Sequence, residues 1–249
     1  MKIIISPAKQ INDLNDFHFK SSTPHFINKA NNLYQYLKSL DYANLKTIMN
    51  ASDKICHSVI NNFNRYDIQS GYINALMAYD GIQYKMMQPS IMDEDTLEYL
   101  NNHLYIVSGL YGLLKPFDLI IPYRLEMQSK IDFNSHHNLY SYWGDGLYQH
   151  IFKDDDILIN LASNEYAKAI TPHKQDKHTI INVYFYELCD GNLKEKGVYV
   201  KMARGMMVQY IALNKLDHPD QLKAFNELNY KYRDDLSSDI NYVFVREKK

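Results

Sequence analysis

The chain has 249 residues, of which 46% are hydrophobic, and its 27 Lys and Arg against 29 Asp and Glu give a formal net charge of -2. This near-neutral balance argues against a uniformly basic nucleic-acid coat, so a polyanion site would have to be a local cluster of cations. The length fits one large α/β domain and no Pro/Gly/Ser-rich linker or repeat divides it, so we expect a single domain over residues 1–249.

The cysteines and the N-terminus indicate the compartment. Cys56 and Cys189 are far apart in the sequence, which is typical of free thiols in a reducing cytoplasm. Only three consecutive apolar residues precede Ser6, too few for a signal peptide or a membrane span. We therefore expect a cytoplasmic protein that does not enter a membrane. The sequence carries no signal for assembly, and we expect a monomer.

The first predicted element is a buried strand. Lys2 to Ser6 is a short β-branched run, and the following Pro7 and Ala8 turn the chain so that Lys9 lies just past the strand end. Apolar residues at helical spacing then predict a helix that begins at Thr23-Pro24 and ends near residue 39.

Two shorter helices are expected next. Asp41 and Ser52 are suitable N-caps, and the second helix would carry Lys54 in its first turn. A lysine at that place opposes the helix dipole unless it reaches out to an anion, although a solvated lysine is the more common outcome. The apolar side chains that this helix is expected to bury are Ile55, Val59 and Phe63.

A hairpin is predicted around Asp80-Gly81. Apolar stretches at residues 75–79 and 82–87 flank this dipeptide, which favours a type I′ turn, and a helix is the alternative for the first stretch. Ser90 to Asp93 then resembles a capping box, so a helix should follow and lead the chain into the next strand.

The longest densely apolar run spans residues 103–127. Leu104 to Val107 predicts a strand buried on both faces, and Ser108 and Gly109 end it. Two charged residues of this segment, Arg124 and Glu126, need partners or a ligand because unpaired burial costs several kcal/mol. A structural Arg124–Glu126 pair and a ligand site both remain open.

The second half of the chain supplies another buried strand. Residues 139–151 predict a helix that Gly144 and Gly146 weaken in its middle, and Ile157 to Ala162 predicts a strand that ends at Ser163. Asn164 can cap a helix that carries Glu165, Tyr166 and Lys168.

The remaining elements are mostly strands. Residues 179–188 and 197–202 are predicted to be strands joined through Asp190-Gly191, with a helix following Arg204-Gly205. Pro219 should open a last helix, and Tyr242 to Val245 should close the chain as an antiparallel edge strand.

Three predicted strands end in serine, and a fourth runs through Lys201 toward Arg204, which predicts a site on one edge of the sheet. Cations dominate the loops after these strands, so a phosphate-bearing ligand is favoured over a neutral one, although solvated surface charges are the alternative for each residue. The candidate phosphate-binding residues are Lys9, Lys54, Lys115, Arg124, Lys168, Lys201 and Arg204. The candidate pocket residues are Ser6, Ser108, Gly109, Ser163, Asn164 and Tyr166.

Catalytic motifs are mostly missing. No Walker loop, GxGxxG, GxSxG, HExxH or CxxC occurs in the sequence. The histidines have no other metal-ligating residues at suitable spacing, so we expect neither a metal nor a cofactor. Glu126 and Glu165 would act as acid and base only if the fold brings them together. The segment VSGLYGLL partly matches the glycine hairpin of a helix-hairpin-helix, whose backbone N–H groups bind phosphate, but Pro116 would cut its second helix short.

Seven motifs, which span nearly the full length, resemble those of the YaaA family of peroxide-stress proteins in the family's order. Three positions differ from the family's usual pattern, namely Lys115, Asn164 and Met202. The motifs are ISPAK at 5–9, SDK at 52–54, SGLYGLLKPFD at 108–118, PYRLEM at 122–127, YWGD at 142–145, INLASNEY at 159–166 and KMARG at 201–205.

The resemblance implies a mixed α/β fold with a positively charged cleft, a helix-hairpin-helix-like element, and binding to double-stranded or branched DNA. It also implies that free iron is lowered during hydrogen peroxide stress. Our leading hypothesis is a non-enzymatic DNA-binding protein of the peroxide response. The alternative is an enzyme that acts on a nucleotide or nucleobase bound near Ser6, Ser108 and Ser163. Direct iron storage is disfavoured, because no His/Cys/carboxylate cluster has ligand spacing.

Overall fold

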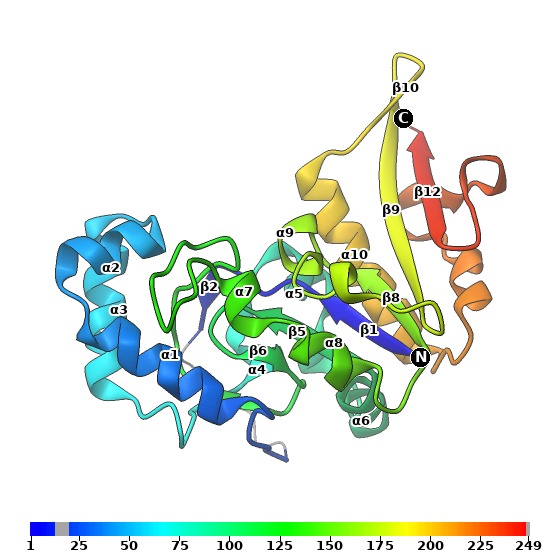
Figure 1. The fold of residues 1–249 in the computed structure, drawn as a ribbon. Helices are drawn as coiled ribbons and strands as arrows, with labels where there is room; N and C mark the ends of the chain where they lie inside the picture. Colours follow the sequence, from blue (N-terminus) through cyan, green and yellow to red (C-terminus); the bar gives the residue numbers. More distant parts are fainter. Residues whose placement is uncertain (13–19, 248–249) are drawn as a thin grey trace.

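A mostly parallel sheet runs through the centre of the molecule (Figure 1). The structure is a computed structural model that describes residues 1–12 and 20–247. Within these residues the sheet has eight strands in the order β11-β12-β9-β8-β1-β5-β6, with β10 paired to β9. The predicted mixed α/β fold with a largely buried sheet is confirmed. The strands are β1 (Lys2–Ile5), β5 (Leu104–Ser108), β6 (Gly112–Leu114), β8 (Ile157–Leu161), β9 (Thr179–Cys189), β10 (Asn192–Lys194), β11 (Tyr230–Tyr232) and β12 (Asn241–Glu247).

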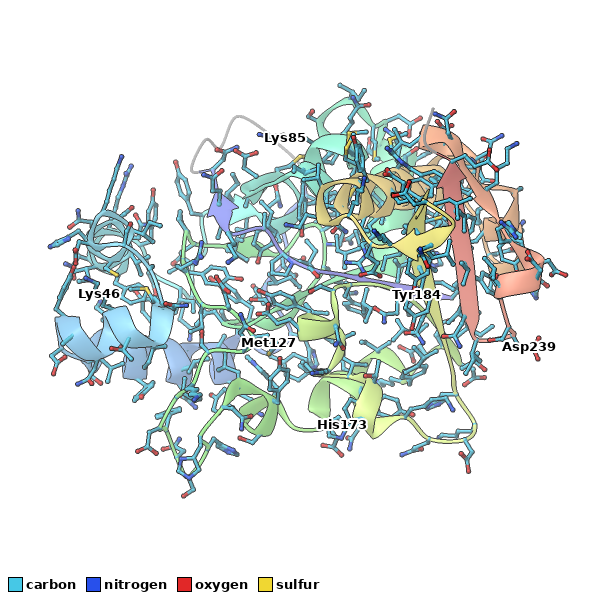
Figure 2. The ribbon with its side chains drawn as sticks, turned by 90° about the horizontal axis from the view of Figure 1, so that it is seen from above. Lys46, Lys85, Met127, His173, Tyr184 and Asp239 are labelled. Atoms are coloured by element: carbon cyan, nitrogen blue, oxygen red, sulfur yellow. The ribbon has the colours of Figure 1, made fainter. Side chains whose placement is uncertain are left out.

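Helices cover both faces of the sheet. Helices α7, α8 and α9 lie on one face, α5, α6 and α10 lie on the other, and α1 to α3 form one end of the molecule (Figure 1). Figure 2 shows Lys46 at this end and Tyr184 of β9 toward the opposite one. The helices are α1 (Ile27–Ser39), α2 (Tyr42–Met49), α3 (Asp53–Arg65), α4 (Ala75–Ala78), α5 (Ile82–Met87), α6 (Glu94–His103), α7 (Leu139–Trp143), α8 (Gly146–Ile151), α9 (Asn164–Ala167) and α10 (Gly197–Leu213).

The three central strands align their carboxyl ends. Strand β1 pairs in parallel with β5 on one side and with β8 on the other, so that Ile5 lies opposite both Ile106 and Leu161. All five residues of β5 are buried, and Ile3 to Ile5 have no exposed surface. Each buried Ile, Leu or Val side chain among them contributes about 1.5–3 kcal/mol by leaving water. The residues that follow these strands are therefore fixed at one edge of the sheet.

The first half of the chain forms the predicted helices, but α1 begins at Ile27 and not at Thr23-Pro24, and one residue predicted to be buried in α3 is exposed. The Asp41 carboxylate caps α2 by accepting a hydrogen bond from the backbone N–H of Asn44 at 2.8 Å. Helix α3 follows Ser52 as expected, but it buries Cys56 in place of Ile55, whose side chain is 39% exposed. Cys56 continues the helical stripe through Val59 and Phe63, whereas Ile55 lies one position out of phase.

The hairpin predicted at Asp80-Gly81 is wrong. Helices α4 and α5 flank this dipeptide, and the short strand β4 (Tyr79–Asp80) pairs with β2 (Gln10–Ile11). Gly81 has φ -163°, an extended conformation that a type I′ turn excludes. Its missing side chain has another use, since an added Cβ would lie 2.9 Å from that of Ala8. A second small pair joins β3 (Ile73–Asn74) to β7 (Leu119–Ile120).

The apolar run at residues 104–114 forms a β-hairpin, so the expected helix-hairpin-helix is absent from this segment. Strands β5 and β6 pair antiparallel, and Gly112 has φ +75° where the turn enters β6. The Ser108 hydroxyl accepts a hydrogen bond from the N–H of Tyr111 at 3.0 Å and closes the turn. Farther back, α6 is capped by Asp93, because Ser90 lies in a 3₁₀ turn at Pro89–Ile91.

Three predictions for the second half are corrected. Residues 197–202 are the start of α10, and β9 turns through Asp190-Gly191 into β10. Ser163 precedes α9 as its N-cap, so that Asn164 is the first helical residue. The predicted last strand exists as β12, but it pairs in parallel with β9, and β11 forms the antiparallel edge. Two other predictions hold in part. Residues 139–151 form two helices, α7 and α8, with Gly144 between them, and Pro219 opens a 3₁₀ helix at Pro219–Ala224 that is not the last helical turn.

Close packing of α10 on α5 yields a stability prediction. A Cβ at Gly205 would lie 2.1 Å from the carbonyl oxygen of Gln83, so Gly205→Ala should lower the free energy of unfolding by about 1–3 kcal/mol through overpacking. Gly197 of the same helix has no heavy atom within 4 Å of its virtual Cβ, and Gly197→Ala should be neutral or stabilise by up to about 1 kcal/mol. Urea denaturation measures both, and equal effects would contradict the packing argument.

Candidate functional site

A cavity of about 560 Å³ opens at the carboxyl ends of β1 and β8. The loop after β1 forms one wall, and α5, α9, α10 and residues 124–126 form the others. Nine sequence-predicted residues line it: Ser6, Lys9, Arg124, Glu126, Ser163, Glu165, Tyr166, Lys201 and Arg204. The lining also includes residues that the sequence did not indicate, among them Ile55, Asp80, Gln83 and Tyr84.

Two serines join the strand ends at the cavity. The Ser6 hydroxyl accepts a hydrogen bond from the backbone N–H of Ser163 at 2.8 Å and donates to the Ser163 hydroxyl at 3.2 Å. The Tyr84 hydroxyl donates to the carbonyl oxygen of Ser6 at 3.0 Å. These bonds tie β1, β8 and α5 together, so the backbone on this side of the cavity is held from three directions.

Ser108 and Gly109 lie behind the cavity. Ser108 is fully buried, and its hydroxyl is 2.6 Å from that of Tyr123, which in turn lies 2.7 Å from the Tyr79 hydroxyl. A Cβ at Gly109 would lie 2.5 Å from the carbonyl oxygen of Leu125. Both residues therefore position the segment that carries Arg124 and Glu126, and neither lines the cavity.

Glu126 holds two of the cations. Its Oε1 accepts from Lys9 Nζ at 2.9 Å and from Arg124 Nη2 at 2.7 Å, and Arg124 Nη1 donates to the Lys9 carbonyl oxygen at 3.2 Å. Burial would raise the pKa of Glu126, but the hydrogen bond and charge of Lys9, together with the charge of Arg124, lower it overall. Glu126 is therefore an ionised carboxylate at neutral pH, and the proposed structural pair with Arg124 exists inside the site.

Glu165 has the opposite tendency. Burial raises its pKa, and the nearby charge of Glu126 raises it further, although the N–H of Gln128 donates to Glu165 Oε1 at 3.3 Å and opposes the shift. One cavity thus contains two carboxyl groups whose pKa values are moved in opposite directions. Such pairs are suited to separate acid and base roles.

Three buried donors in the lining have no acceptor among the described residues. They are Nε of Arg124, Nε of Arg204 and Nε2 of Gln83. Each unsatisfied group costs about 1–3 kcal/mol, and more when it is charged. Arg204 makes neither an ion pair nor a hydrogen bond with any described side chain, and burial lowers its pKa. The side chains that carry these donors line the cavity, where acceptor oxygens of a ligand would lie close to them.

The charge of the lining is positive by a small margin. Four basic residues face three carboxyl groups, those of Asp80, Glu126 and Glu165, and Asp80 is also paired with Lys85 at 2.9 Å. Protonation of Glu165 would increase the surplus. Lys201 and Arg204 are three residues apart in α10, so they project from one face of the helix, although the sequence had indicated a strand.

The other candidate residues lie elsewhere. Lys54 and Lys168 are exposed and do not line this cavity, although Ile55 next to Lys54 does. Asn164 lines an adjoining cavity that shares Arg204 with the first. Lys115 lines a cavity on another part of the sheet. The sequence prediction missed Gln83 and Tyr84, because the chain around Gly81 was interpreted as a turn.

Comparison with known proteins identifies the family. The family model described as "Peroxide stress protein YaaA" matches residues 1–236. The chain belongs to the YaaA family. A relative named UPF0246 protein from Desulfitobacterium hafniense is 44% identical over 249 residues, covering 99% of this chain and 98% of the relative. A UPF0246 protein from Pediococcus pentosaceus is 41% identical over 248 residues, covering 100% and 99%. The YaaA resemblance seen in the motifs is thus confirmed.

Two general searches of this YaaA-family chain complete the description. Among residues 1–12 and 20–247, no group of three or more His, Cys, Asp and Glu side chains is arranged to hold a metal ion. Over the same residues, no helix has the length and apolar character needed to cross a membrane.

The two carboxyl groups should respond oppositely to neutralisation. Because the pKa of Glu126 is lowered by folding, its stabilising effect is present above the normal glutamate range and is lost as pH falls through the lowered pKa. Glu126→Gln should therefore cost about 1–2 kcal/mol of unfolding free energy at pH 7, a cost that shrinks in acid.

Glu165→Gln is the matched control for this measurement. Folding raises the pKa of Glu165, so its charged form opposes folding, and its loss should be neutral or stabilising at pH 7. Denaturation of both variants from pH 3 to pH 8 measures the difference. A pH-independent cost for Glu126→Gln, or an equal cost for both, would contradict the assignment.

Proposed function

We propose that this YaaA-family protein acts in the peroxide stress response by binding DNA through the cavity at the strand ends. The family itself is described by its role in peroxide stress. The observation that supports DNA as the ligand is that Arg124, Arg204 and Gln83, each with a buried donor that lacks an acceptor, line a cavity together with Lys9 and Lys201. Phosphate oxygens are strong acceptors for such donors, and guanidinium groups bind them with two hydrogen bonds.

The mode of binding in this proposal is contact with the backbone. Arginine and lysine contacts to phosphate hold a protein on DNA without reading the bases, so binding should be indifferent to sequence. The site is local, in agreement with the net charge of -2 of the whole chain. The resemblance to the YaaA family also implies that free iron is lowered during peroxide stress, so the proposal includes a role in limiting iron-driven oxidative damage.

Salt dependence tests the proposal. If two to four phosphates are neutralised, the logarithm of the affinity should fall with the logarithm of salt concentration with a slope of about -2 to -4. Lys201→Met should weaken binding to duplexes of all sequences and reduce the slope by about 1.

The matched control is Lys168→Met, which removes an exposed lysine outside the cavity and should leave affinity unchanged. Fluorescence anisotropy of labelled duplex and branched DNA gives both quantities. A flat salt dependence, tight binding to one sequence only, or equal effects of the two lysine variants would each contradict DNA binding through this cavity.

A second candidate function is catalysis on a nucleotide or nucleobase. The observation that favours it is the pair of carboxyl groups, Glu126 with a lowered pKa and Glu165 with a raised one, in a cavity of about 560 Å³. This volume is typical of small-molecule sites. In this reading Arg124 holds phosphate while Glu165 donates a proton and Glu126 remains ionised.

Glu165→Gln separates the two functions, because it preserves shape and removes the titrating proton. Under the binding proposal, cells that carry the variant remain protected from peroxide. Under the catalytic candidate, protection and turnover fall by about 10²-fold or more while DNA and nucleotide binding persist.

A further inference from the structure

A second cavity, of about 240 Å³, lies at the amino-terminal end of the parallel strands. Tyr105, near the start of β5, lines it together with Lys115, which follows the antiparallel strand β6. His25, which precedes α1, and His150 of α8 complete the basic part of the lining. The first cavity opens at the carboxyl ends of these strands, so the two cavities lie at opposite ends of the parallel strands.

The basic groups of this second cavity converge without a free counter-charge. The imidazole rings of His25 and His150 lie with their centroids 4.1 Å apart and their planes inclined by 30°. The ammonium group of Lys115 makes neither a hydrogen bond nor an ion pair with any described residue. The Tyr105 hydroxyl lies 3.5 Å from His150 Nε2 and is a further donor at this place.

The carboxylate in the lining is already committed. Asp118 is only 3% exposed, its Oδ1 accepts from the Ser22 hydroxyl at 2.7 Å, and its Oδ2 accepts from the backbone N–H of Lys115 at 2.8 Å. Both oxygens thus hold backbone and loop in place. Burial raises the pKa of Asp118, and the nearby charges of Lys115 and His25 oppose this shift, so Asp118 balances part of the positive charge without bonding to either side chain.

The surroundings of His150 have a positive potential. Burial, together with the charges of His25, Lys115 and Lys153, lowers the pKa of His150 to about 4, and the charge of Asp154 opposes this shift. The ring is therefore neutral at pH 7 in the unliganded protein. An anion placed among these groups would reverse the balance and favour protonation of the ring.

We propose that this second cavity binds a tetrahedral oxyanion, the phosphate group of a phosphorylated ligand, through Lys115, His25 and His150. The volume exceeds the roughly 30 Å³ of a water molecule several-fold, so an anion fits together with part of its own hydration shell. Lys115 supplies a permanent positive charge, and the two imidazoles supply N–H donors whose number increases on protonation. This site is separate from the cavity proposed to bind DNA and does not depend on that proposal.

Sulfate is the appropriate probe, because its charge stays constant between pH 4 and pH 8 while the protonation of His150 changes. The histidine C2–H resonances in proton NMR spectra report each ring separately. Added sulfate should shift the resonances of His25 and His150, move the titration of His150 to higher pH, and bind more tightly as pH falls. Lys115→Met should weaken sulfate binding about tenfold or more, the loss expected for one charged hydrogen bond.

Two further variants keep the test decisive. Lys168→Met removes an exposed lysine outside both cavities, and it should leave the sulfate titration unchanged. His25→Gln removes an exposed ring, so this variant should fold, and it should weaken sulfate binding and reduce the pH dependence of the affinity. It keeps the proposal testable if Lys115→Met fails to fold. Unshifted His25 and His150 resonances, a pH-independent affinity, or equal losses in Lys115→Met and Lys168→Met would overturn the proposal.

The source of the phosphate is identified by competition, with the His150 resonance as the local readout. Displacement of sulfate by a 5′-phosphorylated oligonucleotide, but not by its unphosphorylated form, would identify a nucleic-acid end as the ligand. Displacement by inorganic phosphate and by neither oligonucleotide would identify a small ligand. If none of the three displaces sulfate, the site does not bind phosphate and the proposal fails.

Discussion

The parallel alignment of β1, β5 and β8 is the constraint on which the candidate site depends. These strands are buried on both faces, so their side chains cannot move to a new register without taking apolar surface into water. Because Ile5 is level with both Ile106 and Leu161, the segments that follow the three strands start from one edge. The chemistry of the site is therefore carried by short loops whose starting points are rigid.

The charged groups of the cavity differ in how well the surrounding residues satisfy them. Glu126 pairs with both Lys9 and Arg124, which leaves this cluster with one surplus positive charge, and Arg124 Nε has no acceptor among the described residues. Arg204 is different, because its Nε has no acceptor among the described residues and burial disfavours its charge, although the charge of Glu195 opposes this effect. A fold that keeps a guanidinium group in this condition gives up stability, and sites that bind anions commonly do so.

The sequence predicted the strand ends because uninterrupted apolar runs require burial on both faces. It could not predict α10, since Val198 and Val200 favour a strand locally, and contact of Gly205 with the Gln83 backbone fixes the helix only in the folded protein. Lys201 and Arg204 nevertheless line the cavity at the strand ends, as predicted. They do so because they lie about one turn apart on α10, and not because a strand ends near them.

The cavity residues that the sequence did not predict are placed by contacts between distant segments of the chain. Gln83 and Tyr84 belong to α5, whose start depends on the close approach of Gly81 to Ala8, a contact between segments more than seventy residues apart. Ile55 reaches the cavity because Cys56 takes its expected place in the core. Such long-range contacts leave no periodic pattern in the local sequence, whereas the buried strands do.

The central claim is that Arg204 is kept at a cost to stability because a ligand needs its charge. Replacing it by methionine retains the aliphatic packing and removes the unsatisfied guanidinium group, so calorimetry of Arg204→Met with and without a DNA duplex tests the claim directly. We predict that the variant alone melts at the same temperature as the wild type or higher, and that DNA raises its melting temperature less than it raises that of the wild type. A lower melting temperature with an undiminished response to DNA would contradict the account.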